Sequence, residues 1–272
     1  MKIKSIILNN KKITYAEINS NMQNTVILIH GLGGDYRGLI DISSCINNHR
    51  IIIPDLPGYG LSEPLDNNHT IENYAHFINS FCKKINIESF ILIGHSFGGA
   101  ISFMYSKLYP NSLTKLILLN PTLENDDTFL ITITRIYMRA IKYMPDTISK
   151  FLLSNKLLVY LTDRSVMTKE GKSAREKILH EDYLNYKRAS SKAMKECSYS
   201  LDTLHIKDYI GEQNIKTLIL LGNKDLLVSP QKISFISDYL NNINIQIIDG
   251  GHLLPQENPK KVGPIINQFI NN

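Results

Sequence analysis

The sequence has few cysteines and no long apolar run. Its three cysteines, Cys45, Cys82 and Cys197, are widely separated and form no CxxC pair. An odd and scattered set indicates neither a disulfide framework nor a zinc site, so we expect buried free thiols in a reducing compartment. No stretch approaches the roughly 18 apolar residues of a membrane-spanning helix, and Met1–Lys12 lacks a secretory apolar segment. We therefore expect a cytoplasmic protein without a membrane span.

Blocks of like charge are also missing. The 272 residues carry 30 Lys+Arg and 25 Asp+Glu, which gives a net charge of +5. Because no run of about five like charges occurs, neither a nucleic-acid-binding nor a membrane-binding patch is expected. The 43% hydrophobic and 20% charged residues are an ordinary globular mixture and argue against disorder.

Short apolar runs without polar alternation recur along the chain. Such runs are typical of strands that are buried on both faces of a parallel sheet. Helical patterns lie between them, for example over 70–85, where Thr70 can cap the helix, and over 98–109. The pattern indicates an α/β sheet with right-handed crossovers, preceded by an antiparallel hairpin of 3–8 and 13–18. The runs are Val26–Ile29, Ile51–Ile53, Phe90–Ile93, Leu116–Leu119, Leu218–Leu221 and Ile245–Ile248.

One interval between the runs is too long for a single crossover helix. The runs that begin at Leu116 and Leu218 are 102 residues apart, whereas the other steps are 25 to 39 residues. We therefore predict a core made of residues 1–122 and 206–272, interrupted by a helical cap at 123–205. The inserted segment has a single glycine, Gly171. Its expected helices span 128–143, 146–161, 168–179 and 181–200, with Pro145 and Gly171 as breaks.

A G-x-S-x-G pentapeptide stands between a predicted strand and a predicted helix. Gly94-His95-Ser96-Phe97-Gly98 follows the run Phe90–Ile93 and opens the next helix. This is the setting of a nucleophile elbow, a tight turn in which side chains at positions 94 and 98 would collide with neighbouring backbone. Ser96 is therefore the candidate nucleophile, at the tip of the turn beside a helix N-terminus.

A serine nucleophile needs a base, and the base needs an orienting carboxylate. Asp225 and His252 both lie just past the ends of predicted strands, in the expected order Ser–Asp–His. We expect His95 to point away across the turn and His30 to brace a loop. Asp202, Glu124, Asp126 and Asp127 are rival acids, and Asn120 occupies a strand end where some enzymes carry the acid.

The negative charge of a tetrahedral intermediate also needs hydrogen-bond donors. The Gly-rich loop His30-Gly31-Leu32-Gly33-Gly34 follows the run Val26–Ile29. We expect the backbone N–H groups of Leu32 and Phe97 to form the oxyanion hole. A phosphate-binding loop is excluded because no Gly-Lys-Ser/Thr follows. This chemistry requires no cofactor and no metal.

Taken together, these motifs resemble those of the α/β-hydrolase fold superfamily, in its cap-bearing serine esterase/lipase-like group. The resemblance runs nearly end to end, except for the segment 123–205, and it implies a mostly parallel eight-stranded sheet flanked by helices, with an inserted helical cap. It also leads us to expect that Gly263 and Pro264 disturb the last helix, 258–271. The matching segments are His30–Gly33, Asp55–Ser62, Gly94–Gly99, Gly222–Asp225 and Gly251–Pro259.

The resemblance also bounds the reaction. Epoxide hydrolases and haloalkane dehalogenases of this fold use an aspartate nucleophile, whereas this chain has Ser96. We therefore expect a serine hydrolase that cleaves a carboxylic ester or thioester. Carbon–carbon hydrolases share the triad but often carry an aromatic residue after the histidine, where this chain has Leu253. A non-catalytic small-molecule receptor of this fold is the other alternative.

The predicted cap is the expected place for substrate selection. Residues 123–205 carry 14 Lys+Arg and 11 Asp+Glu and hold five of the seven arginines of the chain. Solvated helix faces explain this surplus, and an acidic acyl carrier as partner is the alternative. Apolar side chains there belong to the core or line an acyl pocket. The candidates for the pocket are Phe129, Ile133, Tyr137, Met138, Phe151 and Leu152.

Overall fold

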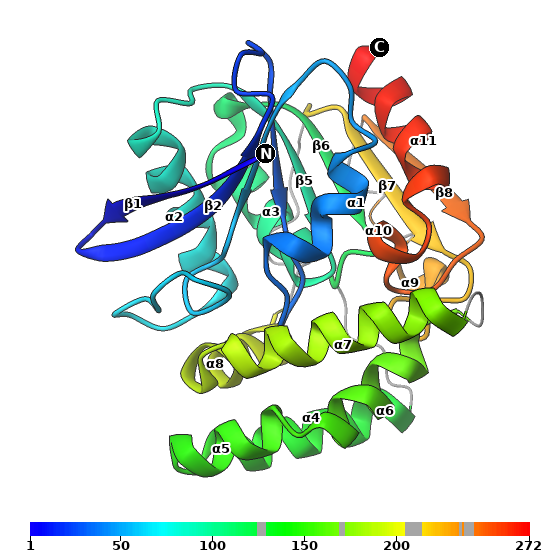
Figure 1. The fold of residues 1–272 in the computed structure, drawn as a ribbon. Coiled ribbons are helices and arrows are strands. Elements are labelled where there is room, and N and C mark those ends of the chain that lie inside the picture. The colour runs from blue at the N-terminus through cyan, green and yellow to red at the C-terminus, as the bar shows by residue number, and fades with distance from the viewer. Residues whose placement is uncertain (124–128, 169–171, 205–213, 234–235, 237–241) are drawn as a thin grey trace.

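The computed structural model describes residues 1–123, 129–168, 172–204, 214–233, 236 and 242–272. An eight-stranded sheet runs through it in the order β1-β2-β4-β3-β5-β6-β7-β8 (Figure 1). β1 pairs antiparallel with β2, β2 pairs antiparallel with β4, and all the other pairs are parallel. The strands are β1 Lys2–Leu8, β2 Lys11–Ile18, β3 Thr25–Ile29, β4 Arg50–Pro54, β5 Phe90–His95, β6 Leu113–Leu119, β7 Thr217–Gly222 and β8 Ile243–Ile248.

The apolar runs form strands because the central strands are covered on both faces. Every residue of β3, β5 and β7 is buried. Successive side chains alternate between the faces, so that Ile27 joins one hydrophobic cluster and Leu28 the other. The predicted mostly parallel eight-stranded sheet is confirmed.

The predicted hairpin at the sheet edge is also confirmed, with slightly longer strands. β1 and β2 pair from Lys2 with Glu17 to Leu8 with Lys11. Asn9 and Asn10 make the turn with φ angles of 50° and 62°. Asparagine tolerates this left-handed region, which a tight hairpin turn requires.

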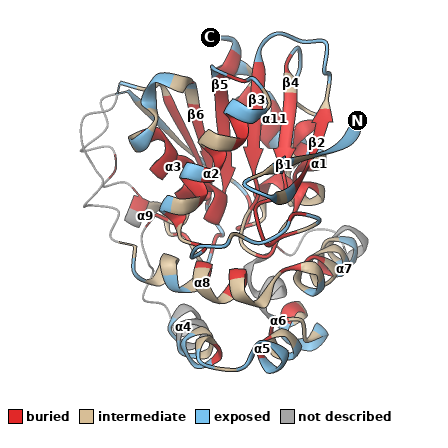
Figure 2. Ribbon diagram, turned by 90° about the vertical axis from the view of Figure 1, so that its left-hand side faces the viewer, coloured by how far each residue is buried: buried red, intermediate tan, exposed pale blue. Residues whose placement is uncertain are grey.

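Helices cover both faces of the sheet. α2 (Ile71–Lys84) and α3 (Phe97–Leu108) contribute to one cluster, and α1 (Ile40–Ser43) and α11 (Pro259–Asn271) to the other (Figure 2). The Thr70 side chain accepts the Asn73 amide and caps α2, as predicted. The expected disturbance of the last helix is wrong, because α11 continues through Pro264. Pro264 is exposed, so water can bond the carbonyl that its missing N–H leaves unpaired.

Among the described residues between β6 and β7 are five helices, which lie beyond the carboxyl ends of the parallel strands (Figure 1). Two predicted boundaries are wrong. The expected helix 146–161 is split by Asn155, whose side chain caps the second half. The expected break near 180 lies inside a helix, and the chain turns instead at Ser190, which caps the next helix. The helices are α4 Phe129–Lys142, α5 Asp146–Leu153, α6 Lys156–Val166, α7 Lys172–Arg188 and α8 Ser191–Asp202.

These helices form two layers. α7 and α8 lie next to the sheet, while α4, α5 and α6 lie on the far side of them (Figure 1). α4 packs on α8, and α6 packs on α7. Whether residues 123–205 form a separate cap domain stays a prediction, and its boundary at 205 and the break at Gly171 lie outside the described residues.

Within the part of the chain that the structure describes, no helix has the length and apolar character needed to cross a membrane. All three cysteines are free thiols; Cys82 and Cys197 are buried, and Cys45 is half-buried. Two short helices, α9 (Pro230–Ile233) and α10 (Leu254–Glu257), follow β7 and β8.

Candidate active site

Ser96 lies in the sharp turn between β5 and α3. Its φ of 54° and ψ of −118° place it in a region that L-residues rarely occupy. A Cβ at Gly94 would collide with the Gly98 carbonyl, and a Cβ at Gly98 would collide with the carbonyls that end β3. The collisions expected from the sequence are therefore found, and the two glycines allow the strand and the helix to approach closely enough for the turn.

Ser96, His252 and Asp225 are joined by two hydrogen bonds. Ser96 Oγ lies 2.8 Å from His252 Nε2, and His252 Nδ1 lies 2.8 Å from Asp225 Oδ2. His252 and Asp225 are 4% and 8% exposed. The carboxylate can only accept, so Nδ1 carries the proton and Nε2 is left to accept from the serine hydroxyl. The structure thus brings together the three residues that the sequence singled out.

Asp225 is held by the loop that follows β7. Its second oxygen, Oδ1, accepts the Leu227 amide at 2.7 Å and the Val228 amide at 3.0 Å. The same loop is bonded to the one after β8, since the Lys224 amide donates to the Gly250 carbonyl. The acid and the base therefore sit on two loops that are fixed to each other.

Two buried side chains that the sequence reasoning did not place in the site hold the backbone of His252. Asn120 Nδ2 donates to the carbonyls of Gly251 and His252, at 2.9 Å each, and Asn120 Oδ1 accepts the Gly222 amide. His95 Nε2 lies 2.9 Å from the His252 carbonyl, so the expectation that His95 points away is wrong. Asn120 follows the end of β6 as Asp225 follows the end of β7, so its position in the sequence points to the site even though an amide cannot serve as the acid.

Burial determines the charge state of His95. Its side chain is enclosed, and desolvation, reinforced by nearby His252, lowers its pKa to about 3. His95 is therefore neutral near pH 7 and donates through Nε2 to the carbonyl that it faces.

The expectation that His30 braces a loop is confirmed, because His30 Nε2 accepts the Leu56 amide at 3.0 Å.

The residues expected to supply the oxyanion donors directly follow Ser96 and Gly31 in the chain. Phe97 is the first residue of α3, where an amide has no partner within the helix. Leu32 follows Gly31, whose Cβ position would be 3.3 Å from the Ser96 Cβ. Within the described part of the chain, neither amide donates a hydrogen bond. Ser96 Oγ also lies 3.3 Å from Thr122 Oγ1, a contact that the sequence did not indicate.

A family model described as alpha/beta hydrolase fold matches residues 24–259. The chain belongs to the α/β hydrolase fold family. A protein of Mycoplasma genitalium named esterase/lipase 2 is 30% identical over 264 residues, which cover 92% of this chain and 90% of the relative. Lipase 3 of Moraxella sp. is 23% identical over 277 residues, covering 93% and 79%. A thermophilic esterase from Thermogutta terrifontis superimposes with a TM-score of 0.79 at 18% identity, covering 100% of this chain and 98% of that one. This α/β hydrolase is accordingly a hydrolytic enzyme.

Helix α7 of the α/β hydrolase crosses the site from one loop to another. At its C-terminal end, Arg188 Nη2 bonds Asp35 Oδ2 at 3.0 Å, and Tyr186 packs against Gly33 of the Gly-rich loop. Just before its N-terminal end, the Thr168 amide donates to Glu257 at 2.7 Å, close to the His252 loop. α7 therefore covers both the expected oxyanion loop and the loop of the base.

Helix α8 is fixed to the core by buried polar groups. The Ser190 amide, at its N-cap, donates to the Gly58 carbonyl at 2.7 Å. Glu196 bonds the buried His69 ring at 2.6 Å and also accepts the His69 amide. Burial lowers the pKa of His69. The inner layer of helices is thus bonded to the α/β core at several points.

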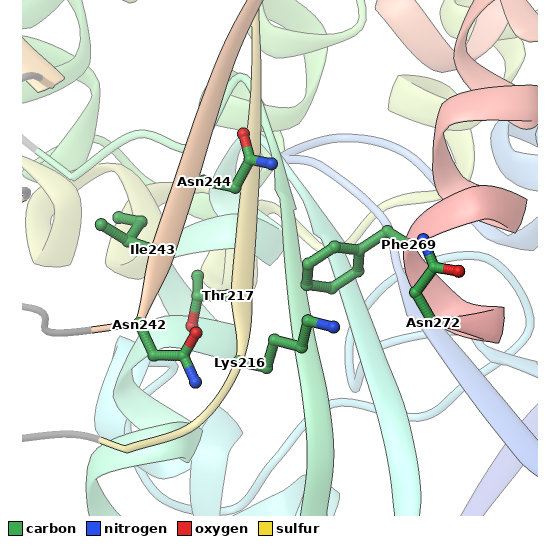
Figure 3. Close-up of a pocket in the computed structure, with 7 residues that line it drawn as sticks. All are labelled: Lys216, Thr217, Asn242, Ile243, Asn244, Phe269 and Asn272. Carbon is green, nitrogen blue, oxygen red and sulfur yellow. The ribbon is translucent and has the colours of Figure 1, made fainter.

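Of the rival acids, the structure describes Asp202, which takes no part in the hydrogen bonds between Ser96, His252 and Asp225. Asp202 bonds Arg139 at 2.8 Å, while Glu124, Asp126 and Asp127 lie outside the described residues. A cavity of about 270 Å³ that includes Lys216, Asn242 and Phe269 lies at the amino ends of β7 and β8 (Figure 3). That edge is opposite to Ser96, and ligands of open α/β sheets bind at the carboxyl ends. Among the described residues, no cluster of three His, Cys, Asp or Glu is arranged to hold a metal.

Proposed function

We propose that this α/β hydrolase cleaves a carboxylic ester or thioester bond through an acyl-enzyme on Ser96. The observation that carries the proposal is the pair of 2.8 Å hydrogen bonds that connect Ser96, His252 and Asp225. The esterases and lipases among its relatives support an ester as the substrate class. In this proposal the substrate is a small molecule.

In the first half of the reaction, Ser96 Oγ bonds to the acyl carbon while His252 Nε2 takes the hydroxyl proton. The carbonyl oxygen gains the negative charge, and the Leu32 and Phe97 amides donate to it. Removing one such donor typically slows acyl transfer about 100- to 1,000-fold. The bond to the leaving group then breaks, and the His252 imidazolium returns its proton to the departing alcohol or thiol.

In the second half, a water molecule takes the place of the leaving group. His252 removes a proton from the water, whose oxygen bonds to the acyl carbon. The tetrahedral intermediate collapses, Ser96 leaves with the proton from His252, and the carboxylic acid is released. Asp225 keeps the imidazole in one tautomer and stabilises its positive charge in both halves.

The proposal does not include an acidic acyl carrier. Three of the five arginines that suggested one are engaged within the chain: Arg139 with Asp202, Arg188 with Asp35, and Arg175 with the Thr168 carbonyl. The side chains of Arg135 and Arg164 lie outside the described residues. Arginines with internal partners explain the positive charge of this segment without a carrier protein.

The mechanism is tested by covalent labelling and by turnover. A fluorophosphonate should react with Ser96, and mass spectrometry of the peptides should locate the adduct there. Ser96→Ala should give no adduct and should lose the activity towards p-nitrophenyl esters. Labelling of another residue in folded protein, or equal ester turnover by both proteins, would overturn the proposal.

A panel of substrates separates this proposal from the alternatives. It combines p-nitrophenyl esters of graded chain length, an acyl thioester and a vinylogous diketone. Faster cleavage of the diketone than of any ester would make the protein a carbon–carbon hydrolase with the same triad. A protein that turns over none of them, but whose Tm rises with a bound ester analogue, would be a receptor of this fold.

A further inference from the structure

Exposed apolar side chains are concentrated on the outer layer of helices. Among the described residues, seven of the sixteen exposed large hydrophobic side chains lie between residues 136 and 161. That segment makes up about a tenth of the chain. Single exposed apolar residues are normal on a protein surface, but a concentration of this kind indicates an interaction site. The most exposed are Tyr143 at 84%, Phe151 at 69% and Leu157 at 67%.

Helical spacing groups these side chains within each helix, and the two helices adjoin. Ile148 and Phe151 are one turn apart on α5, and Leu157 and Leu161 are one turn apart on α6. The two helices meet at the corner formed by Ser154 and Asn155 and contact each other. We call the surface formed by Tyr143, Ile148, Phe151, Leu157 and Leu161 the outer face. Figures 1 and 2 show its helices on the side of the molecule farthest from the sheet.

The inward sides of the same helices are buried and hydrogen-bonded to the rest of the protein. Leu153 of α5 and Val159 of α6 are 6% and 4% exposed. The Lys150 amine reaches inward and donates to the Ala189 and Tyr186 carbonyls at the end of α7. The helices are thus fixed by their buried sides, while the side chains of the outer face remain exposed in the part of the chain that the structure describes.

Positive charge accompanies the outer face. Residues 136–161 include one acid, Asp146, and four basic residues, of which Arg139 is paired with Asp202 and Lys150 reaches inward. Asp146 is paired with Lys195 at 2.7 Å, so little negative charge remains. The other two, Lys142 and Lys156, directly precede Tyr143 and Leu157 in the chain, and their amines lie over the rings of Tyr199 and Tyr160 at 3.2 and 5.3 Å. Aromatic and aliphatic side chains next to lysines are the composition of helices that lie at a lipid–water interface.

Taken together, the exposure and the charge point to one partner. We propose that the outer face docks this hydrolase onto the surface of a membrane that contains anionic lipid. A second copy of the chain would bring Lys142 and Lys156 of both copies into one apolar contact, where like charges repel. A lipid surface instead accepts the apolar side chains between its headgroups and pairs the lysines with phosphates. Docking in this way places the inner helices and the Ser96 end of the sheet towards the lipid.

The test is flotation of the full chain with vesicles of phosphatidylcholine that contain about 30% phosphatidylglycerol. The wild type should float with these vesicles. The double variant Phe151→Ser, Leu157→Ser should bind at least tenfold more weakly. Lys142→Gln with Lys156→Gln should lose the preference for vesicles with phosphatidylglycerol over pure phosphatidylcholine.

The matched control removes exposed apolar side chains elsewhere. Ile7 on β1 and Ile247 on β8 are 59% and 60% exposed, and both lie on the sheet. Ile7→Ser with Ile247→Ser should bind vesicles like the wild type. An unchanged Tm and unchanged turnover of a water-soluble ester should show that the outer-face variants are folded.

Three results would overturn docking. They are a wild type that does not float, equal losses in the control and outer-face variants, and a wild-type dimer in light scattering that the outer-face variant abolishes. The last result would make the outer face an interface between copies. Since docking does not require the reaction at Ser96, an inert protein that still floats would refute only the proposed function.

Discussion

The Ser96 site and the outer face lie beyond the same edge of the sheet, but their side chains are held in different ways. His252 has a partner at each ring nitrogen, and its carbonyl accepts from both Asn120 and His95. Phe151 and Leu157 are instead about two-thirds exposed and are positioned by their helices alone. A reacting group must be held within a fraction of an ångström, whereas side chains that insert into fluid lipid need only to point outward from the protein. Substitutions should therefore have large effects in the first region and small ones in the second.

The largest effect is expected from Asp225→Asn. The amides of Leu227 and Val228 would keep the remaining oxygen, so the new NH₂ group would face His252 Nδ1. Nδ1 would then accept, and Nε2 would carry a proton and could not take one from Ser96. We expect kcat to fall about 10⁴-fold. Ester turnover at saturating substrate measures this.

The rival acid provides the control for this prediction. Asp202, at the end of α8, is bonded to Arg139 of α4 and not to Ser96 or His252. Asp202→Asn should therefore retain the wild-type kcat. If Asp225→Asn kept more than a tenth of the activity, or Asp202→Asn lost as much, the assignment of the acid would be wrong.

The next effect tests the residues that hold His252 from behind. Asn120→Ala would leave the Gly251 carbonyl and the Gly222 amide without their partner at a fully buried position. Each unsatisfied buried group costs about 1–3 kcal/mol, so the two together should lower the free energy of unfolding in urea by about 2–6 kcal/mol. In the fraction that remains folded, kcat should fall while KM changes little, because the base is displaced and the binding surfaces are not. Wild-type stability with wild-type kcat would show that the loops do not depend on Asn120.

The sequence predicts the strand-end site better than the outer helices for a physical reason. Ser96, Asp225 and His252 each follow a buried apolar strand, and a parallel sheet brings its carboxyl ends to one edge. The proximity of these three residues therefore follows from the local sequence patterns and the order of the strands. Asn120 follows the same rule, but an amide carries no obvious chemistry, so its role became clear only from its bonds.

The helices between β6 and β7 offered weaker signals. Asn155 and Ser190 are polar residues inside continuous helical patterns, and each begins a new helix by capping it. A helix break at such a position depends on what the next helix packs against. The exposure of Phe151 has the same origin: a helical stripe of apolar residues suggested core or pocket, and packing left it outside. Tyr137, Met138 and Leu152 pack partly buried against the main cluster, and the side chains of Phe129 and Ile133 lie outside the described residues.

The next prediction concerns how the stability of the Ser96 site depends on pH, and the expected effect is of intermediate size. The pKa of His95 is lowered by burial from 6.5 to about 3, so the unfolded chain binds the proton more readily than the folded one. The contribution of neutral His95 is present above pH 6.5 and is lost as the pH falls towards 3. His95→Gln retains a donor for the His252 carbonyl but cannot titrate. At pH 4.5 the wild type should have lost about 3 kcal/mol through this group, and the variant should be spared that loss.

The measurement is the free energy of unfolding in urea at pH 7 and at pH 4.5. Burial also lowers the pKa of His30 and His69, so the variant should keep part of the acid sensitivity. The same pH dependence in both proteins would mean that His95 is not the group that titrates. Substitutions on the outer face should leave the pH dependence unchanged.

The smallest effect on the free energy of unfolding is expected for the outer face. Helix α5 allows the comparison, because it carries both an exposed and a buried apolar side chain. Phe151 and Leu153 are two residues apart on α5 and point to different faces of it, so Phe151 is 69% exposed and Leu153 is 6% exposed. Phe151→Ser should change the free energy of unfolding by no more than about 0.5 kcal/mol, because it removes no buried contact. Leu153→Ala should cost about 2–5 kcal/mol, since it leaves a cavity in the main hydrophobic cluster. Equal losses would mean that Phe151 is covered in solution, and the outer face would then be part of the fold and not a surface open to lipid.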